Sequence, residues 1–102
     1  MKSGSTGLKD RQLDDLFEAI LSLKTKEECY SFFEDICTVL ELKSISQRYE
    51  VARMLTNHYV YSDIVAETGA STATISRVNR SINYGNGGYA MVFKRLEENK
   101  GK

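Results

Sequence analysis

One stretch of the chain carries side chains that could bind a polyanion. Residues 68–96 contain no acidic side chain, and their basic side chains are Arg77, Arg80, Lys94 and Arg95. Small side chains let a helix approach a DNA groove closely, hydroxyl groups can bond to base edges or phosphates, and guanidinium groups can reach guanine edges or phosphates. The candidate DNA-contact residues are Ser71, Thr72, Ala73, Thr74, Ser76, Arg77 and Arg80.

The pattern around these residues is that of a helix-turn-helix, spanning about residues 61–82. Gly69 lies where the first helix must end with a residue at positive φ, which glycine adopts without steric cost. Ser71, with Thr74 three places on, is a good N-cap for the second helix. The apolar residues that can hold the two helices together are Ile64, Val65, Ile75, Val78 and Ile82. The spacing therefore predicts a second helix that presents its polar face to the major groove.

The first third of the chain predicts two more helices. The whole sequence lacks proline and has no useful alternating apolar pattern, which favours an all-α fold. Apolar residues spaced by three and four positions predict a first helix that ends near Lys24. Thr25 and Glu28 form a capping box that opens a second helix, whose apolar stripe continues to Leu40.

Similar signals place the remaining helices. Ser44 and Gln47 repeat the capping-box pattern and predict that a third helix starts there and ends near residues 57–58. The glycine-rich segment 85–88 precedes the last helix. Tyr84 could stack near a phosphate or cap this loop, and we favour the structural role because buried tyrosines with a bonded hydroxyl are common.

Composition bounds the class of protein. The chain has 102 residues, of which 41% are hydrophobic and 27% charged, as expected for one globular domain, which we place at residues 8–102. Residues 1–7 are rich in small, flexible residues and show no apolar periodicity, which is typical of a disordered leader or a cloning remnant. No apolar stretch approaches the ~20 residues of a membrane span, so we expect no membrane association and a cytoplasmic location.

Neither a metal site nor an active site is predicted. Cys29, Cys37 and the single histidine, His58, do not form a four-ligand set at any familiar zinc spacing. We place both cysteines in one helix, eight residues apart, where they cannot form a disulfide. His58 has no nucleophile or acidic partner nearby in the sequence, so we expect no enzyme.

The helix-turn-helix residues also resemble a known family. The run Gly69 to Arg77, Gly-Ala-Ser-Thr-Ala-Thr-Ile-Ser-Arg, closely resembles a run of the Trp repressor superfamily. Residues 47–55 and 82–86 look like its YerC/YecD branch. The resemblance implies a six-helix fold, an intertwined homodimer, and repression through a palindromic operator whose half-sites lie ~34–36 Å apart.

The resemblance also implies a tryptophan pocket, which this sequence matches only in part. Arg77 matches one of the two arginines that shape this pocket in the Trp repressor. Val78 stands at the place of the glycine that follows it, and Gln47 stands at the second arginine, with Arg48 one position away. Because a side chain replaces the backbone room left by glycine, we expect no cofactor, and a tryptophan-like corepressor remains the less favoured alternative.

An alternative function remains open. Residues 8–42 contain nine acidic and four basic side chains, although the whole chain has a formal net charge of zero. This acidic half could bind a basic protein, with the helix-turn-helix serving only as a scaffold. The alternatives are therefore a sequence-specific, dimeric DNA-binding regulator and a protein-interaction module without direct DNA reading.

Overall fold

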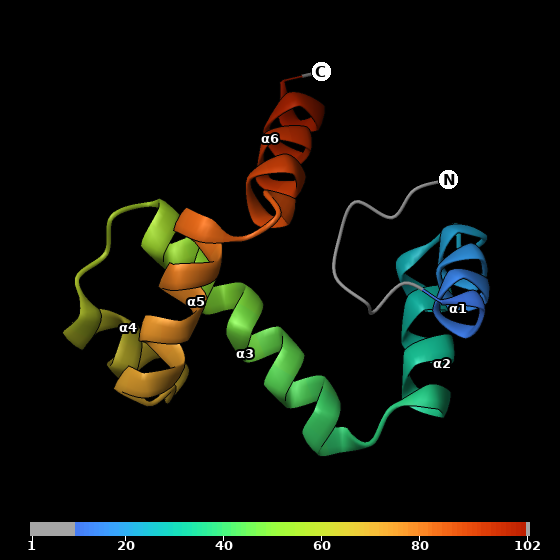
Figure 1. Cartoon of the computed structure of the whole chain (residues 1–102), viewed down its shortest axis with the longest axis horizontal. Helices are drawn as coiled ribbons and strands as arrows, with labels where there is room; N and C mark the ends of the chain where they lie inside the picture. Colours follow the sequence, from blue (N-terminus) through green and yellow to red (C-terminus); the bar gives the residue numbers. More distant parts are fainter. Residues whose placement is uncertain (1–9, 102) are drawn as a thin grey trace. The chain divides into compact units, whose positions relative to one another are not determined.

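The computed structural model describes residues 10–101, and this part of the chain is built from six α-helices without a strand (Figure 1). The helices are α1 (Arg11–Leu21), α2 (Lys26–Ile36), α3 (Val39–Thr56), α4 (Tyr61–Thr68), α5 (Thr72–Tyr84) and α6 (Gly88–Lys100). The predicted all-α, six-helix class is confirmed. The leader assigned to residues 1–7 lies outside the described residues.

The chain divides between Val39 and Leu40 into two compact units, the first containing α1 and α2. The Asp10 side chain caps α1 by accepting a hydrogen bond from the Leu13 backbone N–H at 2.7 Å. The Thr25 hydroxyl accepts from the Glu28 N–H at 3.1 Å, and the Glu28 carboxylate accepts from the Lys24 N–H at 2.7 Å. The predicted helix start at Thr25 is thus confirmed, with the returning bond one residue earlier than in the usual capping box.

Neither helix of the first unit contains a buried residue. Both helices have the apolar spacing of a core-facing helix, yet large apolar side chains remain in contact with solvent. Leu21 is 82% exposed and Tyr30 is 67% exposed, while Phe17 and Ile36 are about half exposed. This unit therefore presents apolar surface that its own two helices do not cover.

The predicted start of the third helix is wrong. Helix α3 begins at Val39, and the chain bends at Cys37, whose backbone is extended, so Cys37 follows α2 rather than lying within it. Ser44 lies inside α3, where its hydroxyl accepts a hydrogen bond from Arg48 Nη1 at 2.8 Å. The Ser44–Gln47 pair imitates a capping box but makes none of its bonds.

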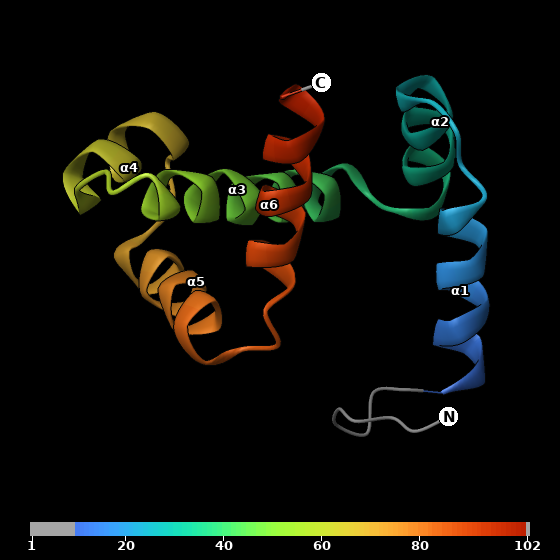
Figure 2. The same ribbon diagram turned by 90° about the horizontal axis from the view of Figure 1, so that it is seen from above.

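The core of the second unit lies where α3, α4 and α5 meet. Its fully or almost fully buried side chains are Val51, Ala52, Met54, Ile64, Ala70, Ile75 and Val78. Figures 1 and 2 both place α4 and α5 beside the C-terminal part of α3. Helix α6 is held to α3 by aromatic contact, since the Tyr49 and Phe93 ring centroids are 5.4 Å apart. Helix α3 is therefore the support on which the helix-turn-helix rests.

Candidate nucleic-acid interface

The turn between α4 and α5 is built as the sequence predicts. Gly69 has φ 72°, and its N–H donates to the Val65 carbonyl at 2.9 Å. The Thr68 hydroxyl donates to the Ile64 carbonyl at 2.7 Å and accepts from the Ala70 N–H at 3.1 Å. Because these bonds satisfy backbone groups at the helix end, the turn has a defined local geometry.

The start of α5 is equally well defined. The Ser71 hydroxyl accepts from the Thr74 N–H at 3.1 Å and donates to the Thr74 hydroxyl at the same distance. The predicted N-cap is confirmed. Helix α5 continues to Tyr84, two residues beyond the end predicted at Ile82.

A side-chain hydrogen bond ties this turn to α3. The Gln47 side-chain Nε2 donates to the Thr68 carbonyl at 3.1 Å, in a half-buried position. Thr68 O belongs to the last turn of α4 and so lacks a partner within its own helix. This hydrogen bond is not predicted from the sequence, because its two residues are 21 positions apart and no local pattern indicates that they meet.

One face of α5 points to solvent and the other to the core. Ile75 and Val78 are buried, whereas six of the seven predicted contact residues are exposed. Thr74 is half-buried and already bonded to Ser71. The exposed residues on α5 share one face at helical spacing, and with the N-cap they are Ser71, Thr72, Ala73, Ser76, Arg77 and Arg80.

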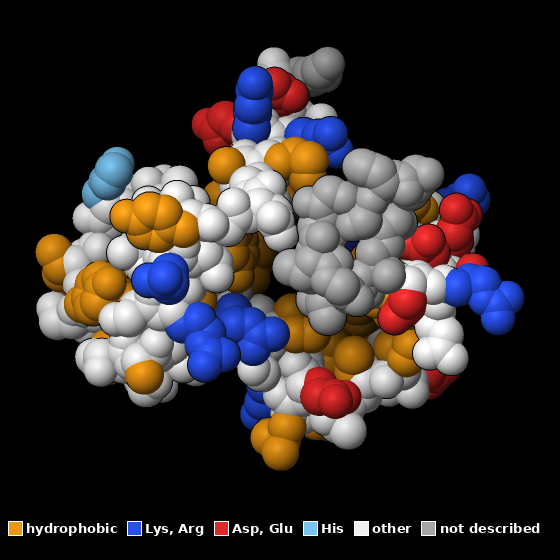
Figure 3. Space-filling model, viewed as in Figure 1, with side chains coloured by type: hydrophobic (Ala, Val, Ile, Leu, Met, Phe, Trp, Pro, Cys, Tyr) orange, Lys and Arg blue, Asp and Glu red, His pale blue; other side chains and the backbone are white. Residues whose placement is uncertain are grey.

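The charge around this face is positive. No carboxylate lies within four residues of Arg77 or Arg80 in the sequence. Figure 3 shows Lys and Arg side chains gathered over α5 on the face in view, without an acidic side chain among them. A phosphate approaching this face meets positive charge and the N–H groups of the capped helix end.

Tyr84 departs from its predicted burial. Its side chain is 80% exposed at the end of α5, so the expectation of a buried tyrosine capping the loop is wrong. The Arg80 guanidinium carbon lies 5.9 Å from the centroid of the Tyr84 ring, a cation–π distance. The helix end is closed instead by the Gly85 N–H, which donates to the Ser81 carbonyl at 2.9 Å.

Two of the positions that the resemblance assigns to a corepressor pocket are occupied by contacts within the chain. Val78 is 2% exposed and belongs to the core, so it occupies space at the place of the pocket glycine. The Gln47 amide is bonded to Thr68, and the neighbouring Arg48 is bonded to Ser44. Arg77 keeps the residue type of the matching pocket arginine, and its side chain is exposed.

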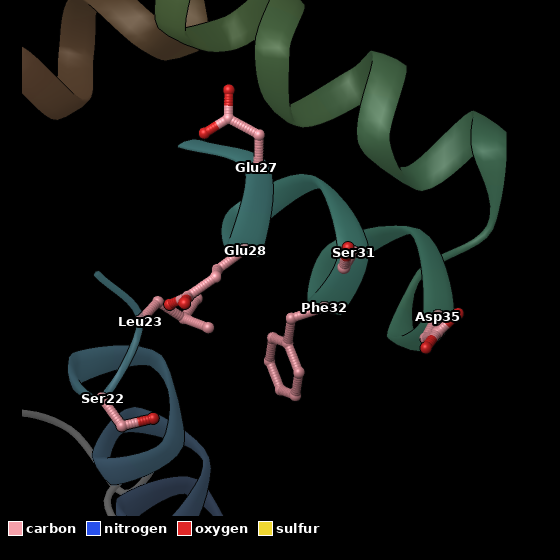
Figure 4. A pocket seen from close by; sticks show the side chains of 7 residues that line it. All are labelled: Ser22, Leu23, Glu27, Glu28, Ser31, Phe32 and Asp35. Atoms are coloured by element: carbon pink, nitrogen blue, oxygen red, sulfur yellow. The ribbon is translucent and has the colours of Figure 1, made fainter. Parts of the chain in front are cut away.

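The first unit carries an acidic pocket, in contrast to the positively charged face of α5. Figure 4 shows its lining side chains, which come from the end of α1, the following turn and α2: Ser22, Leu23, Glu27, Glu28, Ser31, Phe32 and Asp35. Three carboxylates at this pocket would repel a phosphate. The nucleic-acid candidate is therefore confined to the second unit.

Residues 10–101 hold no group of three or more His, Cys, Asp or Glu side chains placed to bind a metal ion. His58 is exposed at the end of α3, with φ 68°, and its N–H donates to the Leu55 carbonyl. Cys29 and Cys37 are free thiols. None of the helices in this described part is long and apolar enough to cross a membrane.

The chain is similar to several known proteins. The Trp repressor protein family model matches residues 11–97. A Bacillus subtilis (strain 168) protein named "Uncharacterized protein YerC" is 57% identical over 91 residues, which are 89% of this chain and 88% of the relative. The crystal structure of a TrpR-like protein from Eubacterium eligens ATCC 27750 has 62% identity and a TM-score of 0.86, covering 88% of this chain and 93% of the other. A structure from Staphylococcus aureus, titled as a putative Trp repressor, has 53% identity and a TM-score of 0.85 over 88% of this chain and 90% of the other. The chain therefore belongs to the Trp repressor family and is related to YerC.

Proposed function

We propose that this protein is a sequence-specific transcriptional regulator that binds a palindromic DNA operator as an intertwined homodimer and acts as a repressor. Residues 8–102 serve as its one functional domain. Membership of the Trp repressor family, whose members are helix-turn-helix regulators and not enzymes, supports this class of function.

The exposed face of α5 carries the proposal. Small and hydroxylated side chains occupy its first turn, where Thr72 and Ala73 allow close approach to base edges. Arg77 follows one turn later and can contact a guanine edge or a phosphate. Each bidentate contact to a base edge contributes about 1–3 kcal/mol of discrimination against the wrong base.

The uncovered apolar surface of the first unit supports dimer formation. Folding α1 and α2 without burying a single residue leaves little to offset the entropy of ordering them. A second copy of the chain would bury side chains such as Leu21 and Tyr30. The two α5 helices of such a dimer would read two symmetric half-sites about one helical turn apart, the geometry established for the Trp repressor and similar proteins.

The state of the corepressor positions supports regulation without tryptophan. Val78 fills the place of a glycine and Gln47 is bonded within the chain, so DNA binding by this protein needs no tryptophan-like corepressor. We place the protein in the cytoplasm, because its relatives are bacterial and DNA-binding regulators act where the chromosome lies.

The test is selection of bound duplexes from a random DNA pool, at moderate salt, with and without L-tryptophan. The wild-type protein is compared with the Arg77→Ala, Arg80→Ala double variant, whose substitutions lie on the solvent face and leave the core intact. A palindromic site enriched by the wild type alone, regardless of tryptophan, is the expected result.

Enrichment by neither protein would contradict direct DNA reading and favour a protein-interaction module centred on the acidic first unit. Such a module would also keep its partner affinity in the double variant and would lack the steep salt dependence of DNA binding. Enrichment that requires tryptophan would contradict the corepressor-free arrangement but not DNA binding itself.

A further inference from the structure

Arg80 and Tyr84 form a contact on α5 that folding does not require. They are four residues apart and therefore neighbours on the helix surface. The guanidinium carbon lies 5.9 Å from the ring centroid, and the ring is 80% exposed. The ring therefore adds little to the core, and the Gly85–Ser81 backbone bond closes the helix without it.

The position of Arg80 along α5 separates its role from that of the first turn. Thr72 begins the helix, and Arg80 lies eight residues later, or about 12 Å along the axis at 1.5 Å per residue. A recognition helix contacts base edges with its N-terminal residues, whereas phosphates border the groove on both sides. A side chain two turns from the helix start is therefore placed toward the border of the groove.

The geometry points to Tyr84 as a positioning residue that holds the Arg80 guanidinium ready for a backbone phosphate. This inference rests on the proposed DNA-binding function and divides the arginines of α5 between two roles. Arg80 supplies affinity without reading sequence, whereas Arg77, one turn closer to the helix start, is left to distinguish bases. Tyr84 acts through Arg80 and makes no contact with DNA of its own.

The ordering of the Arg80 side chain before DNA binds sets how much affinity the loss of Tyr84 should cost. An arginine side chain free to sample many rotamers must be immobilised when it binds, and a stacked one is already restricted. Tyr84→Leu removes the ring and should weaken operator binding about two- to tenfold per protomer. Tyr84→Phe keeps the ring and serves as the matched control, with affinity close to that of the wild type.

The experiment is a double-mutant cycle on the duplex that the wild type selects. Dissociation constants are measured for the wild type, Tyr84→Leu, Tyr84→Phe, Arg80→Ala and the Arg80→Ala, Tyr84→Leu double variant, each over a series of salt concentrations. Thermal midpoints are recorded in parallel. We expect Tyr84→Leu to weaken binding only when Arg80 is present, and Arg80→Ala to reduce the salt slope by about one per protomer.

Each contrary result overturns a specific part of the inference. Equal weakening by Tyr84→Leu with and without Arg80 would mean that the tyrosine acts independently, through DNA contact or through helix stability, and the thermal midpoint would separate these two. Weakening by Tyr84→Phe would assign the role to the hydroxyl. Tighter binding by Tyr84→Leu would mean that Arg80 must leave the ring to bind DNA.

The phosphate role of Arg80 has its own readout. Arg80→Ala should weaken the selected duplex and single-base variants of it by the same factor, whereas loss of discrimination at one base pair would make Arg80 a base-reading residue. Failure of the wild type to bind any duplex would overturn the proposed function together with this inference. Binding by the wild type without coupling between the two residues would overturn the inference alone.

Discussion

The hydrogen bond from Gln47 to the Thr68 carbonyl should be a measurable support of the helix-turn-helix. Gln47→Ala removes the donor and leaves Thr68 O, at the end of α4, without its partner from α3. A hydrogen bond of this kind contributes ~0.5–1.5 kcal/mol, and an acceptor left unpaired in a buried site costs ~1–3 kcal/mol. Because the site is half-buried, water can replace part of the lost bond, and we expect a loss of about 1–2 kcal/mol in the free energy of unfolding.

The neighbouring residue provides a matched control. Ser46→Ala removes an exposed hydroxyl that donates to the Lys43 carbonyl of the same helix, at 3.2 Å. It should change stability by no more than about 0.5 kcal/mol. A third variant, Gln47→Glu, keeps the shape of the side chain but places an oxygen acceptor against a carbonyl oxygen, so at pH 7 it should destabilise more than Gln47→Ala.

Urea unfolding, followed by helical circular dichroism at one fixed protein concentration, gives the three differences. Fixing the concentration matters because the stability of a dimer depends on it. Duplex affinity should fall in the same order as stability, since the bond positions α4 and the turn before α5. Equal stability of Gln47→Ala and Ser46→Ala would refute the reasoning that this bond fixes the turn.

Two further predictions follow from the backbone and the surface charges. Gly69→Ala should lower the free energy of unfolding by about 1–2 kcal/mol because of the positive φ, although no atom crowds the new Cβ. Gly85→Ala should lower it by about 2–3 kcal/mol, because the new Cβ would collide with the Ser81 carbonyl oxygen. Thermal unfolding of both variants tests this order, and a larger loss in Gly69→Ala would contradict it. Hydrogen bonds from the Arg53 guanidinium lower the pKa of Glu50, so this pair stabilises the fold at pH values above the ordinary glutamate pKa, and the contribution is lost as the pH falls through the lowered pKa of folded Glu50. Glu50→Gln should cost at most about 0.5 kcal/mol at pH 7, because both side chains are more than a third exposed, and this cost should shrink as the pH is lowered. A loss from Glu50→Gln that stays the same as the pH is lowered would assign the effect to packing instead.

Local chemistry accounts for what could be predicted from the sequence. Three helix ends lie where the sequence predicts them, at Thr25, Gly69 and Ser71. Each of these residues ends or begins a helix through a hydrogen bond to a residue within four positions, so a local pattern is enough to predict it. The helix-turn-helix and the exposed face of α5 follow from the same short-range rules.

The errors arise where local patterns mislead or where distant residues meet. The bend at Cys37 contains neither glycine nor proline, so no residue type indicates it. The Ser44–Gln47 spacing resembles a capping box, and the predicted start of α3 is therefore five residues too late. The partner of Gln47 lies 21 residues away and is brought there only by packing of α3 against α4. The prediction for Tyr84 fails because the helix was expected to end at Ile82, whereas α5 continues to Tyr84 and the four-residue spacing from Arg80 places Tyr84 on the exposed face.

The most direct test of a dimeric DNA reader is the dependence of affinity on half-site spacing. Duplexes carrying the selected palindrome are compared with duplexes in which five base pairs are inserted at its centre. This insertion rotates one half-site by about half a turn, to the opposite face of the helix. For a dimer that reads both half-sites, affinity should drop to that of a single half-site, whereas unchanged affinity for the lengthened duplex would contradict recognition by two α5 helices held in one dimer.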